Sequence, residues 1–344
     1  MNRFYLLAYF LLSTIFPAIA ADFVPAKLKD NLNPTGIRST ANLSRFEGWT
    51  LLSFIIDKNG LPQHIEVVNS SNNNKYTEDA IGYLQNYRYL PATYKGKKVL
   101  SSSTFLMQHD KSFYGYNNDG ISVGFNLRYN RANKLISDKQ FNKAIDVLDD
   151  LRDTNTKNLT EQALSAWIHS LYYYHVKNWL AYRDNMLEAN QLREYLPVKM
   201  AITNTQNLLQ WQVFQSQYLD AVYTLASMAN IKNSRMDTST HEEMLQPILD
   251  SLKTEAIIEI NTTLSKGKSW LHIIPRSNIT LTTVSGKVEL AELRCDNYWH
   301  EFELAQIDHF NIPESYQNCA ILIKGTPDTQ IKFIEQGELR QKLN

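Results

Sequence analysis

Glycine and proline are scarce in this chain, with 12 and 10 copies among 344 residues. Their scarcity excludes a collagen-like chain and argues against broad disorder, since both classes are rich in these residues. Hydrophobic residues make up 43% and charged residues 20%, a balance that supports packed cores. One core rarely grows past roughly 250 to 300 residues, so we expect two or three domains.

The chain also lacks an excess of charge of either sign. Lysine plus arginine and aspartate plus glutamate both number 35. A chain without net charge has no long-range attraction for phosphate backbones or for anionic lipid. We therefore expect no nucleic-acid partner.

Long apolar runs are missing after residue 20. Before it, the apolar run Phe4–Phe16 is followed by Pro17 and the small-residue pattern Ala18–Ala20. This layout is typical of a secretory signal peptide, here residues 1–20, cleaved near Ala20/Ala21. The alternative is an uncleaved membrane anchor, but the run is shorter than the roughly 20 apolar residues of a spanning helix. The pattern predicts an exported protein.

Cysteine is limited to Cys295 and Cys319, which lie 24 residues apart. In an oxidising compartment an isolated pair most simply forms one disulfide. Such a bridge would stabilise the fold by about 3 kcal/mol. A redox or metal pair would normally show Cys-x-x-Cys spacing, which is absent, so we expect a structural disulfide.

The segment between residues 48 and 107 shows strand and helix patterns in turn. Gly48–Ile56 has the β-branched residues of a strand, and Asp57–Gly60 carries an Asn-Gly turn signal before the partner strand Ile65–Val68. An amphipathic helix over Thr77–Tyr87 follows, and then a strand over Val99–Met107. The predicted order is strand, strand, helix, strand.

These elements carry short motifs in a recognisable order. The motifs are Asp57-x-x-Gly60, Val67–Ser71, Tyr87–Ala92 and Gly96-x-x-Val99. As an ordered set they resemble the TonB C-terminal domain over residues of about 40 to 110, and we place this domain at 34–110. The resemblance implies a TonB-like β-β-α-β fold and a place in the periplasm of a bacterial cell envelope.

The chain departs from the TonB pattern before this domain. TonB proteins keep an N-terminal membrane helix and a long proline-rich spacer, whereas here only Pro25 and Pro34 precede the domain. A released chain without anchor or spacer could not transmit force from the inner membrane. A membrane-anchored energy transducer linked to outer-membrane transport therefore stays as the alternative to a released protein.

Residues 129–264 show helical periodicity. Phe141-x-x-Ala144 recurs as Tyr218-x-x-Ala221, and Trp179 lies between them at intervals of 38 and 39 residues. The segment that begins at Phe141 resembles the second helix of a tetratricopeptide repeat, although the usual spacing is about 34 residues. We predict a helical, tetratricopeptide-like region whose aromatic residues either pack between helices or line a peptide-binding groove.

Residues 268–340 return to short β-branched runs separated by turn residues. Both cysteines fall in this part, so the disulfide would compensate for a small core. We predict a small antiparallel β domain. Together the three regions predict an α+β multidomain protein.

Local signatures of catalysis are absent from the sequence. His300-Glu301 lacks the second histidine of a zinc-protease motif, because Leu304 stands there, and no two histidines are spaced i,i+4. No glycine-rich phosphate loop occurs. We expect no enzyme activity, no metal and no cofactor. The alternative is a hydrolase without a local motif, with His300 beside Asp296 and Glu301.

The edge of the third predicted strand is the main candidate site. In TonB-like domains a sheet edge can accept an extended peptide by strand addition. The residues expected at this edge are Val99, Ser101, Ser103 and Phe105. The alternative is that the edge pairs with the rest of the chain or with a second copy. The sequence thus predicts a non-enzymatic binding or scaffold protein whose partner is an extended segment of an envelope protein.

Overall fold

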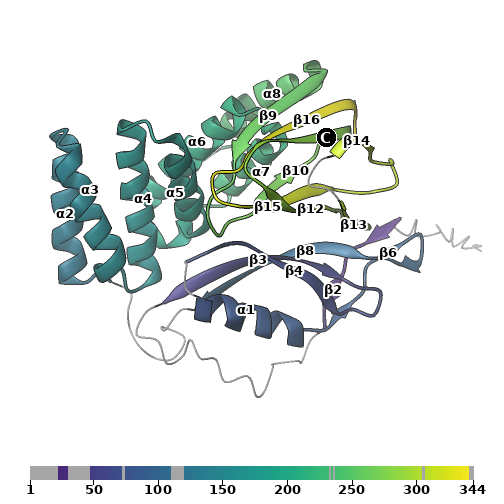
Figure 1. Cartoon of the computed structure of the whole chain (residues 1–344), viewed down its shortest axis with the longest axis horizontal. Coiled ribbons are helices and arrows are strands. Elements are labelled where there is room, and N and C mark those ends of the chain that lie inside the picture. Colours follow the sequence, from purple (N-terminus) through teal and green to yellow (C-terminus); the bar gives the residue numbers. More distant parts are fainter. Residues whose placement is uncertain are drawn as a thin grey trace, which may run out of the picture.

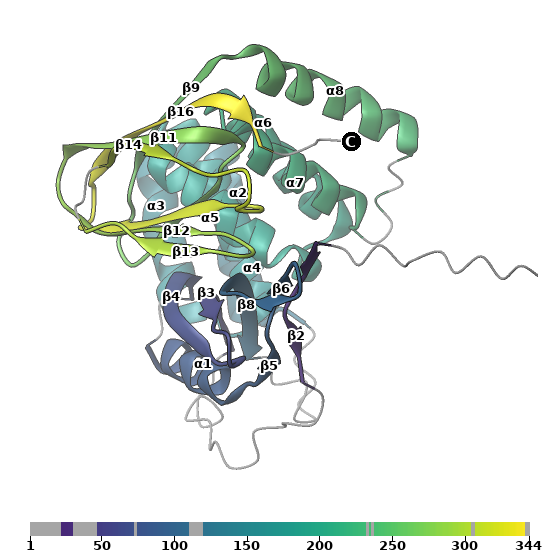
Figure 2. The same cartoon turned by 90° about the vertical axis from the view of Figure 1, so that its right-hand side faces the viewer.

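The chain forms three packed units in a computed structural model, which describes residues 22–29, 47–71, 74–109, 120–231, 234, 237–303 and 307–340. We call them the N-terminal unit (22–109), the helical unit (120–254) and the C-terminal unit (257–340). Figure 1 shows the helical unit and the C-terminal unit side by side, with the N-terminal unit below them. Figure 2 shows the N-terminal sheet beneath the C-terminal strands, with helices behind both.

The N-terminal unit has the predicted order of strand, strand, helix and strand. Its sheet contains β3 (Gly48–Ile56), β4 (Pro62–Ser70) and β8 (Ser101–His109), all antiparallel in the order β4-β3-β8, and α1 (Asn74–Asn86) joins β4 to the later strands. Five two-residue strands complete the unit. They are β1 (Phe23–Val24), β2 (Lys27–Leu28), β5 (Tyr89–Leu90), β6 (Thr93–Tyr94) and β7 (Lys97–Lys98).

The central strand β3 is covered on both faces. Leu52 and Phe54 pack against Leu84 of α1 on one face. On the other face Trp49 is fully buried in the core of the helical unit, where it joins Phe125. Because neither face of β3 meets water, its residues form a near-continuous apolar run.

The helical unit consists of helices that pack against their neighbours in sequence. The elements are α2 (Val123–Ser137), α3 (Phe141–Asp150), the π-helical turn η3 (Leu151–Asn155), α4 (Leu159–His175), α5 (Trp179–Gln191), the 3-10 turn η4 (Arg193–Tyr195), α6 (Val198–Phe214), α7 (Tyr218–Ala229) and α8 (Thr238–Thr254). Side chains cap several helix starts; Asn158, for example, accepts a hydrogen bond from the N–H of Glu161.

One turn recurs three times in this unit, between α2 and α3, α4 and α5, and α6 and α7. In each turn a residue with positive φ lies two positions before the aromatic residue that starts the second helix; these residues are Lys139, Lys177 and Ser216. The next N–H donates to the carbonyl five residues back, at 2.8, 3.0 and 2.8 Å. This bond is the helix-ending pattern that an αL residue permits. The recurrence explains the spacing of the aromatic residues in the sequence, while likeness to tetratricopeptide repeats stays a prediction.

The C-terminal unit is a sandwich of two four-stranded antiparallel sheets, in the orders β14-β11-β16-β9 and β10-β15-β12-β13. Its strands are β9 (Ile257–Thr263), β10 (Trp270–Ile273), β11 (Arg276–Ser285), β12 (Val288–Arg294), β13 (Trp299–Glu301), β14 (Ile307–Asn311), β15 (Ala320–Gly325) and β16 (Gln330–Leu339). Strand β9 lies inside the range 129–264 that the sequence predicts as helical. The boundary is therefore earlier than expected, and β9 ends the sheet that begins at β14.

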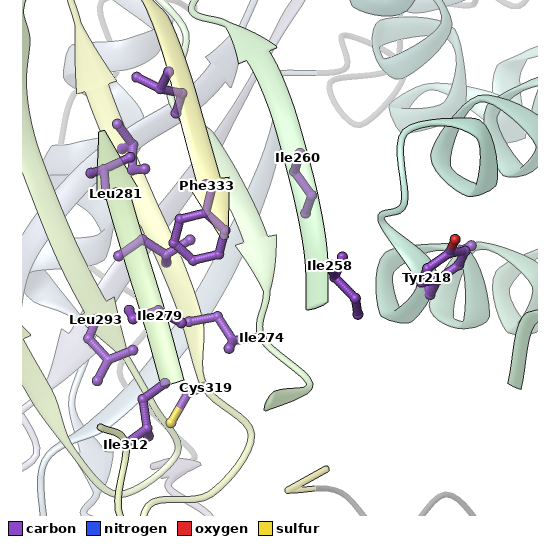
Figure 3. Close-up of a cluster of buried hydrophobic side chains, with 14 of the residues drawn as sticks. Tyr218, Ile258, Ile260, Ile274, Ile279, Leu281, Leu293, Ile312, Cys319 and Phe333 are labelled. Carbon is purple, nitrogen blue, oxygen red and sulfur yellow. The ribbon is translucent and has the colours of Figure 1, made fainter. Parts of the chain in front are cut away.

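The sandwich and the last helices share one apolar core. Leu225 and Met228 of α7 lie in the same buried cluster as Ile258, Ile260 and Phe333 of the sandwich. Figure 3 shows Tyr218 of α7 across from Ile258, with Phe333 and Ile260 on neighbouring strands. Because this interface is a continuous core, the helical and C-terminal units form one body.

Candidate functional site

The residues predicted for a peptide-binding edge lie in or beside β8. Val99 precedes the strand, and its N–H donates to the carbonyl of Ala92 at 3.0 Å. Ser101, Ser103 and Phe105 lie within β8, opposite residues of β3 that face α1. Ser101 is buried, and the other two are half-buried. Their side chains therefore support the inner face of the sheet.

The outward backbone groups of β8 belong to the even-numbered residues. The N–H of Ser102 leaves the sheet and donates to the carbonyl of Cys295 in the C-terminal unit, at 2.9 Å. Since hydrogen-bonded pairs alternate along an antiparallel ladder, Thr104 and Leu106 direct their N–H and C=O groups to the same outer side. The edge of β8 thus pairs with the rest of the chain at Ser102, and this pairing does not involve the odd-numbered residues.

The other end of β8 contacts the helical unit. The side-chain amide of Gln108 donates to Glu194 at 2.6 Å and accepts from the hydroxyl of Tyr195 at 3.4 Å. Between the two contacts Thr104 is exposed. The open part of the edge is therefore short and uncharged, and it centres on Thr104.

The fold of this unit agrees with a comparison of its sequence with known families. Residues 39–106 match the family described as Gram-negative bacterial TonB protein C-terminal. This segment is a TonB C-terminal domain. A search of the curated proteins finds no match to the chain. TonB C-terminal domains typically interact with envelope proteins and are in general non-enzymatic.

The predicted signal peptide falls on residues 1–20, which lie outside the described residues. Within the described ranges, none of the helices combines the length and the apolar character needed to cross a bilayer. Cleavage near Ala20/Ala21 therefore stays a prediction.

The TonB C-terminal domain contacts the sandwich through a buried arginine. The guanidinium of Arg294 is fully buried and bonds to the carboxylate of Glu292, with Nε at 2.8 Å from Oε2. Its other nitrogens donate to the hydroxyl of Ser53 at 3.0 Å and to the carbonyl of His64 at 2.8 Å. One side chain of the sandwich therefore satisfies polar groups on both β3 and the hairpin that leads into β4.

The domain is also fixed to the helical unit near the start of β3. The carboxylate of Glu47 accepts from the N–H of Leu159 at 2.9 Å, at the start of α4. The amide of Gln162 donates to the carbonyl of Glu47 at 2.7 Å. Carboxylates are favourable at helix N-termini, where N–H groups have no partner in the helix. The TonB C-terminal domain is thus bonded to both other units.

The disulfide predicted from the two cysteines is present. Cys295 and Cys319 are bonded at 2.05 Å, and both are fully buried. Cys295 follows β12, and its carbonyl is the group that accepts from Ser102. The bridge therefore lies at the contact between the sandwich and the edge of β8.

The structure does not assemble the histidine and carboxylates of the hydrolase alternative. The ring of His300 lies among aromatic rings, 4.8 Å from Phe302 and 5.6 Å from Phe310. Asp296 accepts from the side-chain amide of Asn318 at 2.5 Å. Among the described residues, no hydrogen bond joins His300 to Asp296 or to Glu301.

A different histidine lies close to two carboxylates. His64, Glu292 and Glu301 place ligand atoms within 4.8 Å of one another. Glu292, however, already bonds to Arg294 and accepts from the indole of Trp299 at 3.2 Å. The guanidinium of Arg294, with its Nε 2.8 Å from the Glu292 carboxylate, would repel a metal cation bound there. We assign no metal to this cluster.

Sequence reasoning missed a charged triad at the contact between α7 and the sandwich. His272 of β10 lies between Asp220 of α7 and Glu335 of β16, with its Nε2 at 2.5 Å from the Glu335 carboxylate. Burial alone would lower the pKa of the His272 imidazole, but the two carboxylates outweigh it and raise the pKa to about 10. Burial raises the pKa of Glu335. The three residues are far apart in sequence, so no local pattern marks them.

Proposed function

We propose that this chain is an exported, periplasmic, non-enzymatic protein that binds an extended segment of an envelope protein by strand addition. The observation that supports this most is the TonB C-terminal domain with β8 at the end of its sheet. Thr104 is exposed, and its main-chain N–H and C=O groups lie on the outer side of that strand. A partner segment would pair with the outward main-chain groups of β8 around Thr104.

In this proposal the residues first predicted at the edge have a supporting role. Ser101, Ser103 and Phe105 direct their backbone toward β3 and their side chains toward α1. Phe105 packs edge-on to Tyr87, with ring centroids 5.6 Å apart. They hold β8 in register, while main-chain groups of the even-numbered residues meet the partner and give affinity.

The contacts of the domain with both other units favour a scaffold over an energy transducer. A transducer needs its C-terminal domain to travel at the end of a spacer. Here Arg294 and Glu47 bond the domain to the sandwich and to α4. Separation would break these bonds and expose to water the apolar contact of Trp49 with the core of the helical unit. The edge of β8 therefore has a fixed orientation relative to the other two units.

Site-specific photo-crosslinking tests the binding edge. A photoreactive phenylalanine analogue replaces Thr104 in one variant, and in a matched control it replaces Gln85, which is exposed on α1. We expect the Thr104 variant to cross-link to one envelope protein in living cells and the Gln85 variant to yield no such product. Equal products from both positions would contradict the proposal. A cross-linked dimer of the chain alone would show that the partner at this edge is a second copy of the chain.

The mass of the mature protein from the envelope fraction tests export. We expect a product that begins near Ala21, with a gain of two hydrogens after reduction of the Cys295–Cys319 bridge. A product that retains residues 1–20 would favour the anchored alternative.

A further inference from the structure

A cleft of about 630 Å³ lies between the helical unit and the sandwich, away from β8. Residues of α5 and α6 line one side, and residues at the end of β9 and the start of β16 line the other. Sites for small molecules usually measure roughly 300 to 1,000 Å³. The cleft is therefore large enough for two or more sugar-sized rings.

Aromatic rings line the helical wall in a continuous strip. Trp211 lies between Trp179 and Phe214, with ring centroids 6.4 and 6.5 Å apart, and Tyr182 adds an edge-on contact with Trp211 at 5.9 Å. Trp179 is 46% exposed and Phe214 is 79% exposed. Contiguous exposed aromatic surface usually marks a binding site, because a monomer gains nothing from leaving it in water.

The remaining lining combines the apolar Leu180, Val284 and Ile331 with polar side chains, and it carries no available charge. Six side-chain amides line the cleft: Asn207, Gln210, Gln215, Gln217, Asn261 and Gln330. Among the described residues of the lining, Arg183 alone bears a formal charge. Its guanidinium is occupied by Asp184 at 2.8 Å, the Thr262 hydroxyl at 2.9 Å and the Ser265 hydroxyl at 2.9 Å. The lining thus favours a neutral ligand with both donors and acceptors.

An extended peptide is the competing occupant, because β9 ends its sheet beside the cleft. The N–H of Leu264 donates to the carbonyl of Thr329, just before β16, at 2.8 Å, so Thr263 and Asn261 direct their main-chain groups outward. The carbonyl of Thr263, the outward group nearest the cleft, accepts from Arg183 at 2.9 Å. A peptide strand would have to displace this bond, which argues against strand addition here.

We propose that this cleft binds a neutral oligosaccharide. The C–H faces of its rings stack on Trp179 and Phe214, since aromatic faces carry negative potential. Its hydroxyls pair with the amide side chains, which also donate and accept. The indole N–H of Trp211 is buried and has no acceptor among the described residues. Because this group has no solvent-accessible surface, we assign it no contact with the ligand.

Titration of the whole chain with neutral hexasaccharides tests the proposal. The panel contains hexamers of glucose, mannose, galactose and N-acetylglucosamine, and calorimetry and tryptophan fluorescence report binding. We expect at least one hexamer to bind, and Trp179→Ala and Phe214→Ala each to weaken it by about tenfold. Tyr223→Ala is the matched control, because Tyr223 is 49% exposed on α7 and does not line the cleft.

Three results would overturn the proposal. The first is that none of the four hexamers binds. The second is that binding survives Trp179→Ala and Phe214→Ala unchanged. The third is that a neutral extended peptide binds the cleft and displaces the sugar at equal or lower concentration, which would make the cleft a peptide groove. Thermal unfolding of each variant identifies one that fails to fold, and Trp179→Phe then replaces Trp179→Ala.

Discussion

Two of the strands at sheet edges, β8 and β9, each have one outward backbone group occupied by another unit. On β8 the N–H of Ser102 donates to the carbonyl of Cys295 at 2.9 Å. On β9 the carbonyl of Thr263 accepts from Arg183 at 2.9 Å. In both strands a contact from a distant part of the sequence covers an edge that would otherwise attract other chains.

The two edges differ beyond that shared contact. On β9 the exposed Glu259 forms an ion pair with Lys332 at 2.6 Å, and charged side chains are a common protection of natural edges. On β8 the exposed residue is the uncharged Thr104. The groups that neighbouring units place against an edge strand therefore decide whether that edge is open or closed. By this criterion β9 is protected and β8 is available.

The largest expected effect comes from loss of the contact between the sandwich and β3. Arg294→Ala should lower the free energy of unfolding by about 3 to 5 kcal/mol, because the buried Glu292 would lose its partner. Urea unfolding measures the change. Arg294→Met with Glu292→Met removes both charges and should recover much of the loss. A single-variant cost below about 1 kcal/mol would contradict a buried ion pair.

Loss of the disulfide should have the next largest effect. Cys295→Ser with Cys319→Ser should cost about 3 kcal/mol, since the bridge closes a loop with a sequence separation of 24 residues. It should also loosen the Cys295 carbonyl from Ser102 and leave the contact of Thr263 with Arg183 intact. Unfolding with and without reductant measures the first effect. The double variant should not respond to reductant, and a response there would point to another cause.

Proline substitutions should distinguish the inward-facing from the outward-facing backbone groups of β8. Ser103→Pro removes an N–H that bonds to β3 and should cost about 2 to 3 kcal/mol. Thr104→Pro removes an outward N–H and should cost less than about 1 kcal/mol, while it weakens capture of the partner segment. Thermal unfolding and cross-linking yield measure both effects. The reverse order of stabilities would show that the outward side is misassigned.

The smallest effect, counted per pH unit, is expected from pH on the sandwich. The pKa of His272 is raised to about 10, from an ordinary value near 6.5, so the folded state holds an extra proton between these values. Its contribution to stability is therefore complete below about pH 6.5 and falls as pH rises toward 10, by at most about 1.4 kcal/mol per pH unit. Urea unfolding from pH 6 to 9.5 measures the slope, and His272→Gln should flatten it. An unchanged slope in that variant would contradict the charged triad.

Local patterns predicted much of the fold. The turn at Asp57–Gly60 and the apolar strand before it predict β3 and β4, and the amphipathic pattern predicts the helix between β4 and β8. The ordered motifs identify the TonB C-terminal domain. The disulfide also follows from two cysteines alone. These features depend on neighbours in sequence or on residue type, so they can be read without the fold.

Long-range features could not be predicted in this way. The sequence suggested the odd-numbered residues of β8, because strand parity alone does not tell which backbone groups face outward. That depends on Cys295, almost 200 residues away. The triad around His272 and the amide-lined cleft also join separate units. The recurring aromatic residues, including Trp179, were the one signal of the cleft, and packing explained them equally well.

Residue-resolved hydrogen exchange of the β8 amides distinguishes an open edge from a closed one. We expect slow exchange at Ser102, whose N–H is bonded to Cys295, and fast exchange at Thr104, whose N–H points outward with no bond among the described residues. In the variant without the disulfide, exchange at Ser102 should become faster. Equal protection of Ser102 and Thr104 would mean that the edge is closed throughout, and it would contradict a binding site for an extended partner on β8.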